Sequence, residues 1–160
     1  MITVKKRSQK QEKSVAKDFI AKVVVASGAL WGAKGDVRSD KFLIECKTTQ
    51  KDYYSLTATI WEKIEQEALK DNLRIPLMAI DIKDRDRVIV FRPKDFNPNI
   101  NTQLFTKEIP KSIRVRADEL GYNSFGDYTY SKVIHICGKK KNVLCLMLQK
   151  DFEQTYKEML

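Results

Sequence analysis

Ligands for a soft metal are scarce in this sequence, which has three cysteines and one histidine among 160 residues. The cysteines are odd in number and none forms a C-x-x-C pair, so the counts argue against a structural zinc site and against a disulfide framework. Cys46, Cys137 and Cys145 each lie in an apolar run. Because a free thiol there behaves as a small hydrophobic side chain, we expect all three in the core.

Long apolar segments are also missing. No run approaches the roughly 18 residues that a membrane-spanning helix needs, and residues 1–13 contain no apolar signal region. We therefore expect a soluble, cytoplasmic protein without a membrane partner. The length fits one domain, which can bury a core without disulfides or a structural metal.

Acidic residues are outnumbered by basic ones, 21 against 30, which gives a formal net charge of +9. This imbalance favours a polyanionic partner, of which nucleic acid is the commonest. A lysine-rich surface that is merely solvated would give the same count. The charge alone therefore does not identify the partner.

Apolar spacing predicts an α/β fold, with a mixed central sheet flanked by helices and a C-terminal β-hairpin and helix. Helices are expected at about 9–25, 59–70 and 151–160. Strands are expected at about 34–38, 42–48, 77–82, 88–91, 113–116, 132–137 and 143–148. Thr59 and Glu62 have the spacing of a capping pair for the second helix.

One hairpin carries a pattern that suggests chemistry. Glu45 and Lys47 alternate along a strand and so share a face. If the preceding turn consists of Asp40 and Lys41 alone, Asp36 lies opposite Glu45, with Cβ atoms about 5 Å apart. Two such carboxylates repel unless a cation such as a hard divalent metal lies between them. Metal, carboxylates and an ammonium group are what phosphodiester hydrolysis needs, although an exposed amphipathic hairpin would show the same residues.

Glu12 adds a third carboxylate. It precedes Val15 by three residues and Ala16 by four, at the N-terminal end of the apolar stripe of the first helix. A carboxylate there is costly without a partner. Either it points into a site beside a metal or Lys47, or it is an exposed residue of a frayed first turn.

The order of these motifs resembles the PD-(D/E)-x-K nuclease superfamily, and within it the small Holliday-junction resolvases of archaea and their phage relatives. The resemblance covers about residues 5–92 and follows the first helix with Glu12, Ser27-Gly28, Gly35-Asp36-Val37 and Ile44-Glu45-Cys46-Lys47. It implies a catalytic set of Glu12, Asp36, Glu45 and Lys47. It also implies that Asp36, Glu45 and the backbone carbonyl of Cys46 bind the metal. Gly35 replaces the proline of the family name, as is frequent in the resolvase branch.

The resemblance also implies an architecture and an activity. Residues 1–96 would form a restriction-endonuclease-like core, and residues 97–160 an extension packed on the same domain. The activity would be Mg²⁺-dependent cleavage of branched or duplex DNA, most specifically of four-way junctions, with Mn²⁺ able to substitute. Symmetric nicking of a junction requires two active sites, so a homodimer is expected. A phage origin, with action in the host cell, fits the same branch. The alternatives are a restriction or mismatch-type endonuclease and a catalytically inactive nucleic-acid-binding module.

Residues around the presumed site are candidates for DNA contacts. Basic side chains there would bind phosphates without reading sequence, and the Ser-Gly loop approaches the junction backbone in the resolvase branch. Ser55, at the expected start of the second helix, could bind a phosphate or cap the helix. The predicted contacts are Arg7, Lys10, Ser27, Gly28, Lys34, Lys51 and Ser55.

Overall fold

A seven-stranded mixed sheet forms the centre of the fold, in the order β1-β2-β3-β5-β6-β9-β8. The computed structural model describes residues 3–20, 22–24, 36–96, 108–120 and 132–160. The strands of the sheet are β1 (Lys22–Val23), β2 (Val37–Arg38), β3 (Phe42–Thr49), β5 (Ile75–Ile82), β6 (Asp86–Phe91), β8 (Lys132–Cys137) and β9 (Lys141–Leu148). A separate two-stranded sheet pairs β4 (Tyr54–Thr57) with β7 (Ser112–Val115). Only the β3–β5 pairing is parallel among the strand pairs described.

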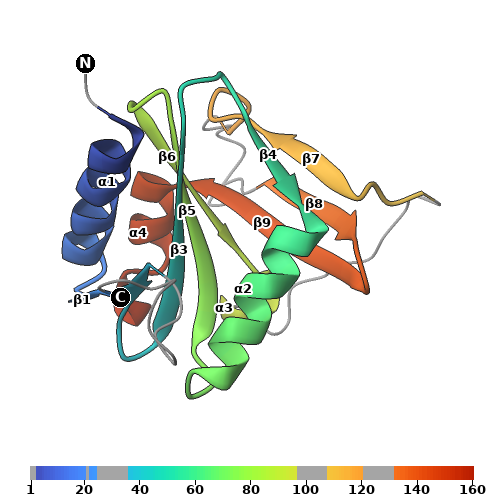
Figure 1. Ribbon diagram of the computed structural model, residues 1–160. Coiled ribbons are helices and arrows are strands. Elements are labelled where there is room, and N and C mark those ends of the chain that lie inside the picture. The colour runs from blue at the N-terminus through green and yellow to red at the C-terminus, as the bar shows by residue number, and fades with distance from the viewer. Residues whose placement is uncertain (1–2, 21, 25–35, 97–107, 121–131) are drawn as a thin grey trace.

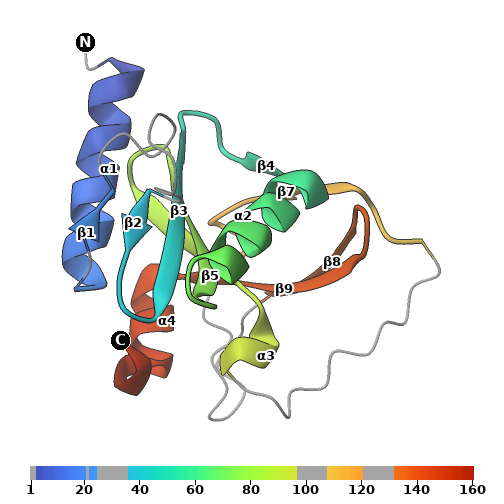
Figure 2. The same ribbon diagram turned by 60° about the horizontal axis from the view of Figure 1, so that its bottom comes forward.

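Helices cover both faces of the large sheet (Figures 1 and 2). They are α1 (Val4–Asp18), α2 (Ala58–Lys70), α3 (Pro93–Phe96) and α4 (Gln149–Thr155), followed by the 3₁₀ turn η1 (Lys157–Met159). Alternation along β5 divides the core: Met78 and Ile80 pack with Trp61 of α2, whereas Leu77 and Ala79 belong to the cluster under α1 and α4. The predicted α/β architecture is thus confirmed, with helical layers on either side of a mixed sheet.

The first helix is shorter at its C-terminal end than its apolar spacing predicts. Thr3 caps its start by accepting a hydrogen bond from the backbone N–H of Lys6. The helix ends at Asp18, and Ile20 adopts a positive φ of 47° with 85% of its surface exposed. Val23, which was expected in the helix, pairs instead with Val37 as part of β1. The left-handed backbone at Ile20 reverses the chain, so the helical spacing of the last apolar residues was misleading.

The predicted cap of the second helix is wrong. Thr57 is the N-cap, and its side chain accepts a hydrogen bond from the N–H of Ile60. Ser55 lies in β4 opposite Arg114, so it does not cap the helix. Glu62 is buried on α2 and accepts hydrogen bonds from the turn of the C-terminal hairpin.

The C-terminal hairpin and helix are confirmed and extend the same sheet. Strand β9 is hydrogen-bonded to β6 on one side and to β8 on the other. The Glu62 carboxylate binds the backbone N–H groups of Lys139 and Lys140, each at 3.2 Å, and the amide of Asn142 at 3.0 Å. Backbone pairing and a buried carboxylate therefore join the last third of the chain to the segment that carries the predicted site.

The three cysteines, all expected in the core, differ in their burial. Cys46 and Cys145 are buried free thiols, as predicted, whereas Cys137 is only half-buried on the outer strand β8. Cys137 lies at the strand end, next to the exposed hairpin turn, which explains why its surroundings leave it partly open to solvent.

In the part of the chain that the structure describes, no helix combines the length and apolar character required to cross a bilayer.

Candidate active site

The β2–β3 hairpin has the two-residue turn that the sequence predicts. Val37 pairs with Ile44 and Arg38 with Leu43 across an antiparallel ladder. The ladder stops there, because the N–H of Asp36 donates to the carbonyl of Ile44, the same residue that Val37 pairs with. The N–H of Ser39 donates to the carbonyl of Phe42 over 3.0 Å, which leaves only two residues in the turn. The hairpin therefore brings Asp36 beside the segment of β3 that carries Glu45.

Asp36 turns its carboxylate back toward strand β3. Its Oδ2 accepts a hydrogen bond of 2.8 Å from the backbone N–H of Cys46, and its own N–H donates to the carbonyl of Ile44 over 3.1 Å. Because Cys46 lies between Glu45 and Lys47 in β3, this bond holds the Asp36 carboxylate beside the Glu-x-Lys segment.

Glu45 and Lys47 form a short ion pair on one face of β3. The Lys47 Nζ lies 2.6 Å from Glu45 Oε1, as expected for residues that alternate along a strand. Burial alone would lower the pKa of Lys47, but the hydrogen bond to Glu45 and its negative charge outweigh burial and raise the pKa above the usual 10.5. Tyr54 and Asp36 act in the same direction. Lys47 is therefore fully charged at neutral pH.

Glu12 approaches these residues from α1, which packs against β3. Its side chain is partly buried, and burial raises the pKa of its carboxyl above 4.5. The charges of Asp36 and Glu45 raise it further, so the Glu12 carboxyl lies within electrostatic range of both. The helix thus brings a third carboxyl group within electrostatic range of the hairpin, while the predicted orientation of Glu12 into a site stays a prediction.

The three acids do not form a ready-made metal site in the described residues, where no group of three His, Cys, Asp or Glu side chains lies close enough to hold an ion. The carboxylates of Asp36 and Glu45 are bound by protein donors instead, the N–H of Cys46 and the ammonium group of Lys47. An all-oxygen set of carboxylates nevertheless suits a hard cation such as Mg²⁺. The residues fit such an ion if Glu45 Oε1 contacts the ion and Lys47 together, or if the Glu45 side chain rotates toward the ion.

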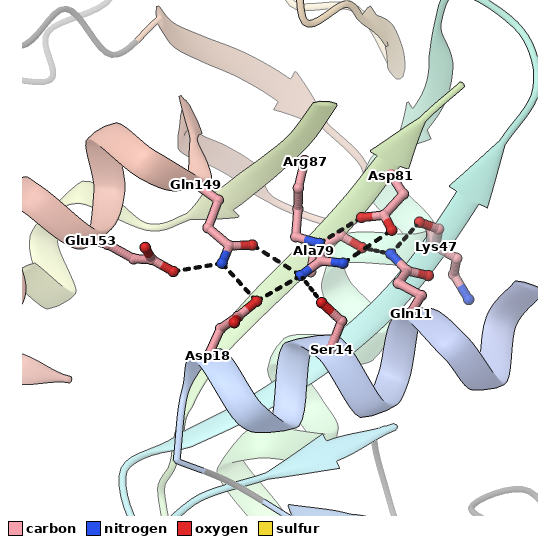
Figure 3. A network of polar contacts seen from close by, with 9 residues as sticks. All are labelled: Gln11, Ser14, Asp18, Lys47, Ala79, Asp81, Arg87, Gln149 and Glu153. Carbon is pink, nitrogen blue, oxygen red and sulfur yellow. Dashed lines mark hydrogen bonds and ion pairs between the residues drawn. The ribbon is translucent and has the colours of Figure 1, made fainter. Parts of the chain in front are cut away.

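A hydrogen-bonded residue that sequence reasoning missed fixes α1 to the sheet beside this site (Figure 3). The side-chain amide of Gln11, which is 3% exposed, donates to the carbonyl oxygens of Lys47 at 2.7 Å and of Ala79 at 3.0 Å. The signal was present, because Gln11 precedes Val15 by four residues and so continues the buried stripe of the helix. Gln11 is the neighbour of Glu12, so its two hydrogen bonds fix the position of Glu12 relative to β3.

Arg87 is a second missed residue, and it joins three elements on the same face (Figure 3). Its guanidinium binds both carboxylate oxygens of Asp81, at 2.6 and 3.1 Å. It also binds Ser14 and Asp18 of α1 and Gln149 of α4. Asp81 was a usable signal, because it interrupts an otherwise apolar strand. This network fastens α1 to β5, β6 and α4 and thereby keeps Glu12 in place.

The predicted DNA contacts fall in different places. Arg7 forms an ion pair with Asp84 at 3.3 Å, and Lys10 is exposed on the same helix. Lys51 is exposed after β3, and Ser55 is exposed on β4. Ser27, Gly28 and Lys34 lie outside the described residues.

Comparison with known proteins gives little further guidance. No family model and no curated protein matches the chain. Among solved structures, the chain is similar to Hjc, a Holliday junction resolvase from the archaeal hyperthermophile Archaeoglobus fulgidus. The TM-score is 0.45 and the sequence identity 13%, over 69% of this chain and 88% of the other. At this score and identity the similarity assigns neither activity nor substrate, and a proposed function must rest on the side chains of this chain.

Proposed function

We propose that the chain is a divalent-metal-dependent endonuclease that hydrolyses DNA phosphodiester bonds, with four-way junctions as its preferred substrate. One observation carries the proposal: Asp36, Glu45 and Lys47 meet at the β2–β3 hairpin, where the N–H of Cys46 orients Asp36 and Lys47 pairs with Glu45. Glu12 adds a third carboxylate within electrostatic range. This is the residue set of the PD-(D/E)-x-K pattern, which supports the choice of reaction.

Each residue has a role that follows from its chemistry. Asp36, Glu45 and the carbonyl oxygen of Cys46 would hold Mg²⁺, or Mn²⁺ in its place. When bound, such an ion polarises a phosphoryl oxygen and lowers the pKa of an attacking water. Glu12 would orient that water by accepting its hydrogen bond. Lys47, kept protonated by Glu45, would stabilise the charge that develops on the phosphoryl oxygens.

The preference for a junction and the oligomeric state go together. A four-way junction is resolved by two symmetric nicks, and the described residues of one chain contain one such site, so a two-fold homodimer is part of the proposal. A sequence-specific endonuclease would instead need side chains that read base edges.

The test compares a labelled synthetic four-way junction with a linear duplex of the same sequence, using the wild-type chain and Asp36→Asn in Mg²⁺. We expect the wild type to nick the junction preferentially, and Asp36→Asn to bind it without cleaving. Equal cleavage of both substrates would overturn the junction preference while leaving a nuclease. Binding without cleavage by the wild type, in Mg²⁺ and in Mn²⁺, would indicate an inactive binding module.

Metal binding can be measured without activity. Calorimetric titration with Mn²⁺ should show a site in the wild type that Asp36→Asn weakens, since the variant loses one anionic ligand. Equal affinity in both proteins would remove Asp36 from the metal site.

A further inference from the structure

The two-stranded sheet of β4 and β7 has one buried face and one exposed face. Leu56 and Val115 point into the core and are fully buried, whereas Ser55 and Arg114, which face each other across the pair, are exposed. Alternation therefore assigns the exposed side chains to a single outer face. We call this surface the β4–β7 outer face; it comprises Tyr53, Ser55, Arg114 and Arg116, with Lys51 at its edge.

Three cations surround one aromatic ring on the β4–β7 outer face. The Cζ atom of Arg114 lies 4.7 Å from the ring centroid of Tyr53, that of Arg116 lies 5.5 Å away, and Lys51 Nζ lies 5.7 Å away. Ring contacts of this kind hold guanidinium groups in fixed orientations, and Arg presents its donors in a planar fork. The arrangement concentrates three positive charges around one ring.

Acidic neighbours neutralise only part of this charge. Glu119 lies 3.7 Å from Arg116 but also pairs with Lys132. Asp52 pairs with Lys83. Glu119 is thus shared with a cation outside the cluster and Asp52 is paired with one, so the outer face retains a positive excess in a chain that carries +9 overall.

The cluster lies next to the candidate active site. Tyr54, which follows Tyr53 directly, is partly buried, and burial raises the pKa of its hydroxyl. The charge of Lys47 lowers this pKa and the charge of Glu45 raises it. Strand β4 therefore passes within electrostatic range of Lys47. Figure 1 shows β4 and β7 side by side just beyond the end of β3.

We propose that the β4–β7 outer face binds the sugar-phosphate backbone of a duplex DNA arm adjacent to the bond that is cleaved. Fixed guanidinium groups contact phosphates without reading sequence, as substrates of varied sequence require. The exposed hydroxyl of Ser55 can donate to the same backbone. The position relative to a cleaved bond rests on the proposed function, whereas DNA binding by this surface does not.

The test measures binding to a linear duplex by fluorescence anisotropy over a salt series, in EDTA so that no cleavage occurs. The variant is Arg114→Gln/Arg116→Gln, and the matched control is Lys63→Gln/Lys70→Gln, which removes the same charge from exposed positions of α2. We expect the first variant to bind more weakly, with a slope of log K against log salt that is shallower by about 1.8, because each lost phosphate contact removes about 0.9. The control should keep the wild-type slope.

Two results would overturn the proposal: an unchanged affinity and slope in Arg114→Gln/Arg116→Gln, or an equal loss in the α2 control. Melting temperatures check folding, and Arg114→Lys/Arg116→Lys provides a second variant in case the first is unstable. It keeps the charge but loses the planar fork, so we expect intermediate affinity; wild-type affinity would refute the role of the fork.

Tyr53 offers an independent arm of the same experiment. Tyr53→Phe keeps the ring and should bind as the wild type does, whereas Tyr53→Ala should weaken binding because the guanidinium groups lose their support. Equal binding by both would show that the ring does not organise the surface. These binding measurements are made without metal and do not depend on cleavage. A wild-type protein that binds duplex DNA here but does not cleave DNA in the separate assay with Mg²⁺ or Mn²⁺ would therefore refute only the proposed nuclease activity.

Discussion

The side-chain amide of Gln11 donates a hydrogen bond of 2.7 Å to the carbonyl oxygen of Lys47. It therefore joins the helix residue next to Glu12 to the backbone of the site lysine. The same amide binds Ala79 on β5, so three elements meet at one buried side chain. A helix that could slide along the sheet would carry Glu12 with it, and this contact fixes its register.

Replacing Gln11 with methionine should impair cleavage more than binding. Methionine fills a similar volume but donates no hydrogen bond, so Glu12 loses its fixed position over Lys47. We expect DNA cleavage to fall by about 10- to 100-fold, as for other residues that orient a metal site, with DNA affinity unchanged. Single-turnover cleavage and anisotropy measure the two effects. Lys13→Met, an exposed change on the same helix, is the control; equal rates in the two variants would deny Gln11 a positioning role.

The hairpin of the site could be predicted from sequence because its determinants are local. Alternation places Glu45 and Lys47 on one face, and the two-residue turn at Asp40 and Lys41 sets the register that pairs Val37 with Ile44, next to Asp36. These relationships depend on a few neighbouring residues. The ion pair of Lys47 with Glu45 confirms that these two side chains share a face. The ladder ends before Asp36, whose N–H bonds to the carbonyl of Ile44, so its position opposite Glu45 stays a prediction.

Contacts between distant segments could not be predicted in the same way. Arg87 is 69 residues from Asp18 and 62 from Gln149, and only the sheet order brings them together. Glu62 has the spacing of a capping residue, yet it serves a hairpin 77 residues further along. Local spacing alone cannot separate such roles, because a polar residue on a buried face is satisfied by whatever the fold places opposite it.

Removing Arg87 should destabilise the whole domain. Arg87→Met leaves the half-buried Asp81 without its bidentate partner and releases Asp18 and Gln149. We expect the free energy of unfolding to drop by about 2 to 3 kcal/mol, somewhat less than breaking a fully buried pair costs. Chemical denaturation measures the change. Arg85→Met, on the adjoining exposed turn, should have little effect.

A second variant tests whether the lost charge balance causes that effect. In Asp81→Leu/Arg87→Met both charges are removed, so the double variant should be more stable than Arg87→Met alone. If the double variant were the less stable of the two, the cost would come from lost packing and not from an unpaired carboxylate.

Lys47 should contribute to cleavage, and its deprotonation should not reduce the cleavage rate at alkaline pH. Its pKa lies above 10.5, because the hydrogen bond and charge of Glu45 outweigh the effect of burial, so it remains protonated across pH 7 to 9. Lys47→Met should reduce the cleavage rate by about 100- to 1000-fold, the usual cost of losing one charge-stabilising donor. Wild type and Lys47→Arg should share the same alkaline profile. An alkaline loss of activity in the wild type that Lys47→Arg abolishes would contradict this assignment.

The ionised carboxylate of Glu12 should lower the stability of the folded protein at neutral pH. Its pKa is raised above 4.5 by burial and by the charges of Asp36 and Glu45, so the folded protein binds a proton there more tightly than the unfolded chain does. The free energy of unfolding therefore falls as pH rises from 4.5 through the raised pKa, and the deficit persists at neutral pH. Glu12→Gln should melt at a higher temperature than the wild type at pH 7 and lose this advantage at pH 4.

The same substitution should lower activity, since the ionised carboxylate is what would orient the water. The wild-type cleavage rate should decline as pH falls through the raised pKa of Glu12, at a higher pH than an ordinary glutamate would give. Glu12→Gln should be slow at every pH, and its residual rate should lack that acidic limb. Lys13→Gln, at the exposed neighbouring position, controls for the helix substitution. A Glu12→Gln protein that is both more stable and fully active would show that the carboxylate is an accident of packing, because a group that costs stability and adds no rate has no catalytic role.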